Sequence, residues 1–179
     1  KICAFNLKTG ELIWSADQNI FGTWLSYSAE NDILLQAGRA SRDMLEGESK
    51  NRISTFVGKK GNLLWDKQLN YTGPCLLSGN DILTQNLGFN ILTGSQKTKI
   101  DPITKENIIW SYARNYGCNT AIGSKNLITF RSAAAGYYDL KNDSGTGNFG
   151  GFRSGCNSNL IIADGILSVP EYTRTCTCS

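Results

Sequence analysis

Histidine is absent from this chain of 179 residues. Its absence removes the usual general base of enzymes, the commonest zinc ligand and the one side chain that normally titrates near neutral pH. The cysteines end in a C-x-C pair with no second close pair, which does not match the common spacings of structural zinc sites. We therefore expect no His-based catalytic site and no zinc site.

Net charge and long apolar segments are also scarce. The net charge is only +3 and the basic residues are scattered, so we expect no nucleic-acid partner. No run of residues approaches the ~18 apolar residues that a membrane-spanning helix needs, so we expect no membrane span. The first residues resemble the middle of a strand and carry no signal-peptide pattern. We expect the chain to be a fragment of a larger protein.

Helical periodicity is missing as well, and a repeat stands in its place. The pattern of residues 4–14 (AFNLKTGELIW) recurs at 55–65. A degenerate third copy, with Glu106 at the glycine position, lies at 100–110. The three tryptophans of these copies, Trp14, Trp65 and Trp110, follow each other at intervals of 51 and 45 residues. A second element, a polar turn followed by a short apolar strand, recurs at residues 31–36, 80–85, 125–130 and 163–168.

Each repeat thus contains about four short strands in roughly 40–50 residues, which is typical of propeller blades. The sequence predicts an all-β fold, a partial β-propeller of four-stranded antiparallel blades, with about four blades' worth of a larger ring. We expect one partial propeller over residues 1–179. Its predicted parts are a half blade over 1–17, blades over 20–68 and 71–113, and irregular blades over 118–179. Polar insertion loops are predicted at 41–51 and 86–99.

The repeated residues have a structural interpretation. Glycine in the tight turn between the third and fourth strands permits a positive φ. The tryptophan ring of the fourth strand can cover apolar surface between neighbouring blades while its N–H reaches a backbone carbonyl, and a small residue lets the ring pack closely. The residues predicted to be structural are Ala4, Gly10, Trp14, Gly61, Trp65 and Trp110.

The pattern Ala-x-Asp-x-x-Thr-Gly-x-x-x-Trp resembles the tryptophan-docking motif of the quinoprotein-like (PQQ-repeat, BamB-like) β-propeller superfamily. Ala4, Thr9, Gly10 and Trp14 match it, with Asn6 in place of Asp. Residues 116–120 and 175–178 are similar to PQQ-repeat proteins of planctomycete-type bacteria. The resemblance implies a periplasmic or otherwise extracytoplasmic bacterial protein. Its propeller would act as a binding or scaffold module whose partner is a protein or the rest of its own ring.

The same superfamily includes PQQ-dependent alcohol and sugar dehydrogenases, which is the alternative interpretation. The resemblance then implies a calcium site built from Glu, Asn and Asp, and a vicinal cysteine pair. Cys176-Thr177-Cys178 is not vicinal, and no carboxylate cluster has calcium-ligand spacing. We therefore predict a non-enzymatic module with no catalytic, cofactor-binding or metal-binding residues. PQQ with calcium belongs only to the alternative.

Three further features lie in the last third of the chain. Residues 145–150 (GTGNFG) match G-x-G-x-x-G, but residues 151–155 cannot open a helix, so we expect a flexible loop rather than a nucleotide site. Arg131, Arg153 and Arg174 either are ordinary surface arginines or converge on an anion. Cys156 and the pair Cys176 and Cys178 flank a predicted hairpin, so a disulfide from Cys156 to one of the two is expected. A redox pair and buried thiols are the alternatives.

Overall fold

The computed structural model describes residues 1–38, 49, 51–156 and 158–170. In this part of the chain all regular elements are strands and none is a helix, as predicted. Accordingly, the described residues include no helix of the length and apolar character needed to cross a membrane. The chain divides into two compact units, Lys1–Ile109 and Trp110–Ser179, and each is described by itself.

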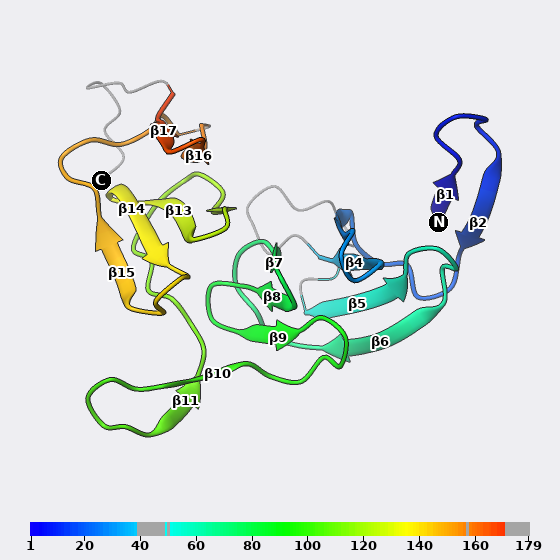
Figure 1. Ribbon diagram of the computed structural model, residues 1–179, viewed down its shortest axis with the longest axis horizontal. Coiled ribbons are helices and arrows are strands. Elements are labelled where there is room, and N and C mark those ends of the chain that lie inside the picture. Colours follow the sequence, from blue (N-terminus) through cyan, green and yellow to red (C-terminus); the bar gives the residue numbers. More distant parts are fainter. Residues whose placement is uncertain (39–48, 50, 157, 171–179) are drawn as a thin grey trace. The chain divides into compact units, whose positions relative to one another are not determined.

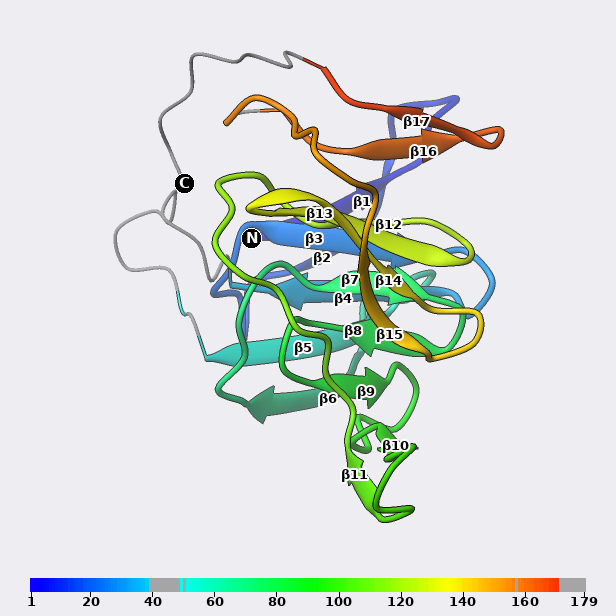
Figure 2. The same ribbon diagram turned by 90° about the vertical axis from the view of Figure 1, so that its left-hand side faces the viewer.

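The centre of the first unit is a four-stranded antiparallel sheet whose strands follow each other in chain order (Figures 1 and 2). The strands are β3 (Trp24–Ser28), β4 (Ile33–Ala37), β5 (Arg52–Val57) and β6 (Leu63–Gln68). The two middle strands are largely buried, whereas β3 and β6 alternate or are partly exposed. This is the up-and-down arrangement of a propeller blade.

A three-stranded sheet follows, with β7 (Leu76–Ser78), β8 (Asp81–Leu83) and β9 (Gly88–Asn90). A bridge between Phe89 and Gln96 continues it, and a hairpin of β10 (Thr98–Ile100) and β11 (Asn107–Ile109) comes next. The predicted insertion loop over 86–99 is therefore wrong, because residues 88–90 form β9, Gln96 bridges back to Phe89 and β10 begins at Thr98. Most of the other predicted insertion, 41–51, lies outside the described residues.

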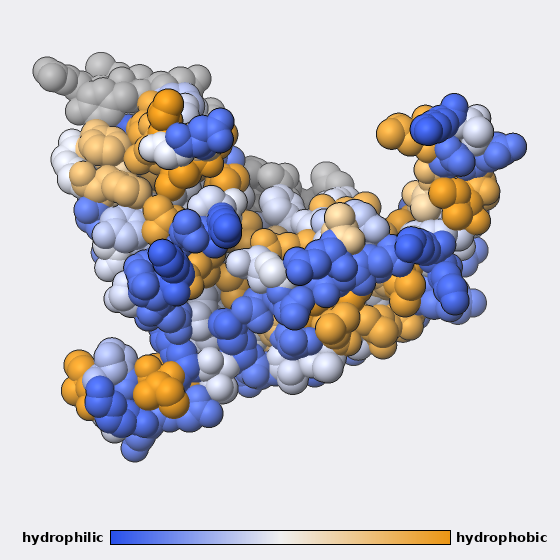
Figure 3. Space-filling model, viewed as in Figure 1, coloured by the Kyte–Doolittle hydropathy of each residue, from blue (hydrophilic) through white to orange (hydrophobic). Residues whose placement is uncertain are grey.

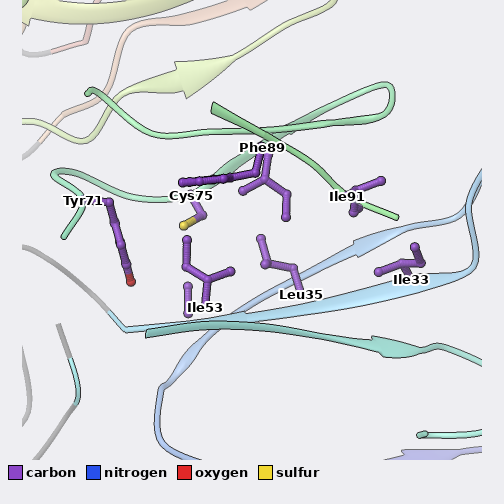
Figure 4. Packing of buried hydrophobic residues seen from close by; sticks show 9 residues of the cluster. Ile33, Leu35, Ile53, Tyr71, Cys75, Phe89 and Ile91 are labelled. Atoms are coloured by element: carbon purple, nitrogen blue, oxygen red, sulfur yellow. The ribbon is translucent and has the colours of Figure 1, made fainter. Parts of the chain in front are cut away.

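The hydrophobic core of the first unit lies between these two sheets. Ile33, Leu35 and Ile53 point from β4 and β5 towards Phe89 and Ile91 of the next sheet, with Tyr71 and Cys75 beside them (Figure 4). Full burial of a Leu or Ile side chain contributes about 1.5–3 kcal/mol, so this cluster is the main source of stability in the unit.

The unit begins with a separate hairpin of β1 (Ile2–Phe5) and β2 (Leu12–Ala16). Its register shifts between Ala4 and Phe5, and the β5–β6 hairpin shifts at the equivalent place, between Thr55 and Phe56. The shared shift is a β-bulge, which increases local twist and re-aims the neighbouring side chains. The two hairpins are therefore copies of one structural element, as their sequences suggested.

The second unit contains another four-stranded antiparallel sheet in chain order and one hairpin. The sheet comprises β12 (Ile122–Gly123), β13 (Leu127–Ser132), β14 (Ala134–Asp139) and β15 (Gly145–Asn148), and the hairpin comprises β16 (Ile161–Ala163) and β17 (Ile166–Ser168).

The expectation of a flexible loop over 145–150 is wrong for most of that segment, because residues 145–148 form β15. Two of its glycines have steric roles: Gly145 has a φ of +99°, and a Cβ on Gly147 would lie 2.4 Å from the Tyr137 ring. The blade boundaries themselves stay a prediction.

Candidate functional site

In the described part of the first unit the same six-residue turn occurs at residues 6–11, 57–62, 90–95 and 101–106. Three of these turns join paired strands, and the turn at 90–95 lies between β9 and the bridge from Phe89 to Gln96. In each copy the N–H of the first residue donates to the carbonyl of the sixth, at 2.8 Å. The carbonyl of the first residue accepts from the N–H of the fifth, at 2.7–3.0 Å. The fifth residue has a positive φ in every copy: Gly10, Gly61, Gly94 and Lys105.

In three of the four copies a short polar side chain explains why the sequence forms this turn, whereas turn 57–62 begins with Val57. The side-chain oxygen of Asn6 accepts hydrogen bonds from the N–H groups of Lys8 and Thr9. Asn90 and Asp101 accept the corresponding pairs in their own turns. These Asx turns hold the backbone in place before the strand resumes. The Asx-x-x-Thr-Gly pattern therefore has a backbone function in this protein.

Two details of the turns differ from the sequence interpretation. In the degenerate copy at 100–110, Lys105 and not Glu106 occupies the fifth position of the turn, where the other copies have glycine, with a φ of +63°. The turn at 90–95 was missed altogether, although Asn90, Thr93 and Gly94 reproduce Asn6, Thr9 and Gly10. The signal is present in the sequence, although no tryptophan follows this copy at the expected distance.

Tryptophans from preceding strands lie on two of these turns. Trp14, in β2, donates its indole N–H to the carbonyl of Gly58 at 2.7 Å, and a Cβ on Gly61 would lie 2.5 Å from its ring. Trp65, in β6, repeats this geometry on the next turn. Its N–H donates to Ile91 at 2.8 Å, and a Cβ on Gly94 would lie 3.0 Å from its ring. In both cases the second residue accepts the hydrogen bond and the fifth lies beneath the ring.

Trp110 makes a related contact within the second unit. It is fully buried, and its indole N–H donates to the Asp143 carboxylate at 3.0 Å in the turn between β14 and β15. The hydroxyl of Tyr138 donates to the same carboxylate, and the Tyr138 and Trp110 rings meet edge to face at 5.5 Å. Burial, and then the Asp143 hydrogen bond, raise the pKa of Tyr138 above its ordinary 10.0, so the hydroxyl, already protonated at neutral pH, stays a donor in more alkaline solution as well.

The remaining predicted structural residues lie near these contacts. Ala4 is the cross-strand partner of Trp14, and Thr55 has the same relation to Trp65. Gly10 occupies the fifth position of turn 6–11. The stabilising role of this set of residues stays a prediction. The sequence interpretation also missed Trp24, in β3, whose N–H donates to the carbonyl of Cys75 at 2.9 Å.

Cys176 and Cys178, the two possible partners of Cys156 in the predicted disulfide, lie outside the described residues. Cys156 is half-buried, with its Sγ 3.6 Å from Nη1 of Arg131. Cys75 is fully buried, and burial raises the pKa of its thiol. Within the described residues no disulfide is present.

Among the arginines considered for an anion site, Arg131 is fully buried, so its interpretation as a surface residue is wrong. Its backbone N–H donates to the Asn119 side chain, and its carbonyl accepts from Arg114. Arg153 is half-buried, and Arg174 lies outside the described residues. No group of three Cys, Asp or Glu side chains that could hold a metal ion occurs in the described part of the chain.

Comparisons with known proteins bear on the fold. Neither the models of known protein families nor the curated proteins contain a match. Among solved structures, BamB from Moraxella catarrhalis is similar, with a TM-score of 0.50 and 14% sequence identity. The match covers 78% of this chain, and the chain spans only 40% of that BamB chain. Together with the in-order antiparallel sheets, this likeness identifies the fold as a partial β-propeller.

Proposed function

We propose that this chain is a segment of a non-enzymatic β-propeller that serves as a binding scaffold for protein partners in a larger extracytoplasmic bacterial protein. The observation that carries the proposal is the use of the repeated motif. Its polar residues form Asx turns, and its tryptophans are engaged by those turns or by Asp143. The residues that the repeats have in common therefore hold a scaffold together, with no reaction centre among them.

The surface of the first unit supports a protein partner. Large apolar side chains are exposed on two hairpins and appear as orange patches on them in Figure 3. Exposed apolar patches mark protein–protein contacts more often than other surfaces do. They also suit contact with further blades of the same ring. The residues are Phe5, Leu7, Leu12 and Ile13 on β1–β2, and Ile100, Ile103 and Ile109 on β10–β11.

A site-specific photo-crosslinker tests the protein-binding proposal. We place it at Ile103, which is 88% exposed at the tip of the β10–β11 hairpin, in the full-length protein in its own cells. Lys141, an exposed residue in the β14–β15 turn, is the matched control position. We expect a defined protein adduct from Ile103 and none from Lys141. Equal adducts at both positions, or none at Ile103, would contradict the proposal.

A titration with PQQ and calcium separates the scaffold from the dehydrogenase alternative. We expect no saturable, calcium-dependent change in quinone absorbance on the full-length protein and no dye-linked oxidation of alcohols or sugars. A saturable change accompanied by turnover would establish the alternative. Fractionation of the same cells tests the location, with the protein expected outside the cytoplasm.

A further inference from the structure

Two loops of the second unit carry the same four-residue pattern. Residues 117–120 are Gly-Cys-Asn-Thr and residues 155–158 are Gly-Cys-Asn-Ser. The first loop leads into β12 and the second precedes β16. Neither Cys118 nor Cys156 lies in a strand, and neither takes part in a tryptophan contact described above. The scaffold contacts therefore do not explain the two cysteines.

The side chain of Asn119 joins the loop of Cys156 to β13. Its Nδ2 donates to Ser154 Oγ at 3.2 Å and to the Ser158 carbonyl at 3.4 Å, on either side of Cys156 in the sequence. Its Oδ1 accepts from the backbone N–H of Arg131 at 2.9 Å. One amide thus binds both partners, and it fixes the loop beside the strand that carries Arg131.

This arrangement places the Cys156 thiol next to a buried cation. Its Sγ lies 3.6 Å from Nη1 of Arg131, whose side chain is fully buried. The thiol itself is half-buried and therefore reaches solvent. A guanidinium shielded from water attracts an anion more strongly than one in bulk solvent. The position of Arg131 therefore favours the thiolate over the thiol.

The other charged side chains around Cys156 act mostly in the same direction. The loop and the segments that contact it contribute three arginines: Arg114, Arg131 and Arg153. Of the carboxylates on these segments, Asp139 ends β14 and Asp164 follows β16, in each case at the end away from the loop. Asp139 accepts its hydrogen bonds within its own turn. The described surroundings of Cys156 therefore stabilise a negative charge on its sulfur.

We propose that Cys156 is a reactive thiolate held next to Arg131, and that it accepts low-molecular-weight disulfides by thiol–disulfide exchange. In this step the Cys156 sulfur attacks one sulfur of a disulfide RS–SR. A bond forms between Cys156 and one RS group, the original S–S bond breaks, and the other RS group leaves as a thiolate that takes up a proton from water. Cys156 is oxidised to the mixed disulfide and RS–SR is reduced to one thiol. The inference depends neither on what the propeller binds nor on which cysteine later displaces the RS group.

Competition between two thiols of one protein provides the test. The reduced full-length protein is mixed with oxidised glutathione at neutral pH. Remaining thiols are blocked with N-ethylmaleimide at intervals, and mass spectrometry of the digest gives the rate for each cysteine. Cys3, an exposed thiol in the first unit, supplies the reference rate. The same experiment in denaturing guanidinium chloride gives both rates in the unfolded chain.

Matched variants separate the charge of Arg131 from its packing. Arg131→Met removes the charge and keeps a long unbranched side chain, whereas Arg131→Lys keeps the charge. Lys125→Met is the control, because it removes the same charge from an exposed residue in the turn before β13. Near-UV circular dichroism shows which variants are folded. Should Arg131→Met unfold, the comparison of Cys156 with Cys3 in the unchanged protein decides the question.

We expect Cys156 to react about tenfold or more faster than Cys3 in the folded protein, and at a similar rate in the unfolded chain. Alkylation of Cys156 by iodoacetamide should reach its plateau about 1 pH unit or more below that of Cys3. Folded Arg131→Met should lose most of this advantage, whereas Lys125→Met should retain all of it and Arg131→Lys a part. Equal rates for the two thiols in the unchanged folded protein would overturn the proposal. So would an advantage that persists in Arg131→Met or in the denatured chain.

Discussion

Tryptophan differs from the other aromatic residues in having a donor at the edge of a large flat ring. When the ring is covered, its N–H must find an acceptor or remain unsatisfied. All four tryptophans of this chain do so, and three of them use a turn of a following sheet. This explains why phenylalanine would not be an equivalent residue at these positions.

Replacement of Trp65 measures the energy of one docking contact. Because the ring is half-buried, Trp65→Ala should lower the free energy of unfolding by about 2–3 kcal/mol, less than the usual cost for a fully packed ring. Trp65→Phe keeps an aromatic ring but leaves the Ile91 carbonyl without its donor, and should cost about 1 kcal/mol. Urea melts measure both values.

Leu92→Ala, on the exposed side of the same turn, serves as the control. A loss below about 1 kcal/mol for Trp65→Ala would refute the clamp role.

The glycine beneath a ring gives an independent measure. Gly79→Ala introduces a side chain at a φ of +56° in open space and should cost about 1–2 kcal/mol from backbone strain alone. Gly61→Ala adds a clash with the Trp14 ring at 2.5 Å, so its cost should exceed that of Gly79→Ala by about 1–3 kcal/mol. Equal losses in denaturant melts would show that the ring moves aside freely.

At the scale of elements, the hairpins could be predicted because their residues repeat. Alternating apolar positions and a glycine turn followed by tryptophan are local signals that β1–β2 and β5–β6 share, and β1–β2 has the Asx-Thr-Gly turn as well. The strand at 145–148 could not be, because its composition is that of a loop. The ring of Tyr137, the cross-strand partner of Gly147, leaves no room for a Cβ at that position, and this contact depends on register.

The β10–β11 hairpin should respond to acid through Asp101. Hydrogen bonds from the N–H groups of Thr104 and Ile103 lower the pKa of this carboxyl below its ordinary 3.8. The folded hairpin therefore favours the ionised form. Its contribution is present above the ordinary pKa and is lost as the pH falls through the lowered one. The amide proton shifts of Ile103 and Thr104 should titrate below 3.8, and Asp101→Asn should abolish the titration while preserving the turn, as Asn6 and Asn90 do. A midpoint at or above 3.8 would contradict this account.

At the scale of the whole molecule, the sequence predicted the class of fold but not the assignment of contacts. The spacing of the tryptophans indicated blades, yet nothing local links Trp110 to Asp143, which lies 33 residues further along the chain. The carboxylate there replaces the backbone carbonyl that Trp14 and Trp65 use. Which distant residues pair depends on which turn lies beside each tryptophan in the folded chain. The sequence analysis does not identify the turn at 90–95, which receives Trp65.

The predicted disulfide also belongs to this scale, because it would close a loop of about 20 residues and stabilise the protein by roughly 3 kcal/mol. In the oxidised protein we expect Cys156 joined to Cys176 or Cys178. Mass spectrometry of a digest prepared without reductant identifies the pair, and a reduced and alkylated digest is the control. All three cysteines recovered as free thiols would remove both the bridge and one argument for an extracytoplasmic location.

The docking contact has a direction, since the β5–β6 hairpin places Trp65 on a turn of the sheet that follows and receives Trp14 of the preceding hairpin on its own turn. Interfaces of this head-to-tail kind close into rings when the rotation permits and otherwise grow into filaments. Growth needs a free donor as well as a free acceptor. No described residue covers Gly10 of turn 6–11, whereas each of the four tryptophans already has an acceptor of its own. By this contact, copies of it should therefore act as chain terminators and not polymerise.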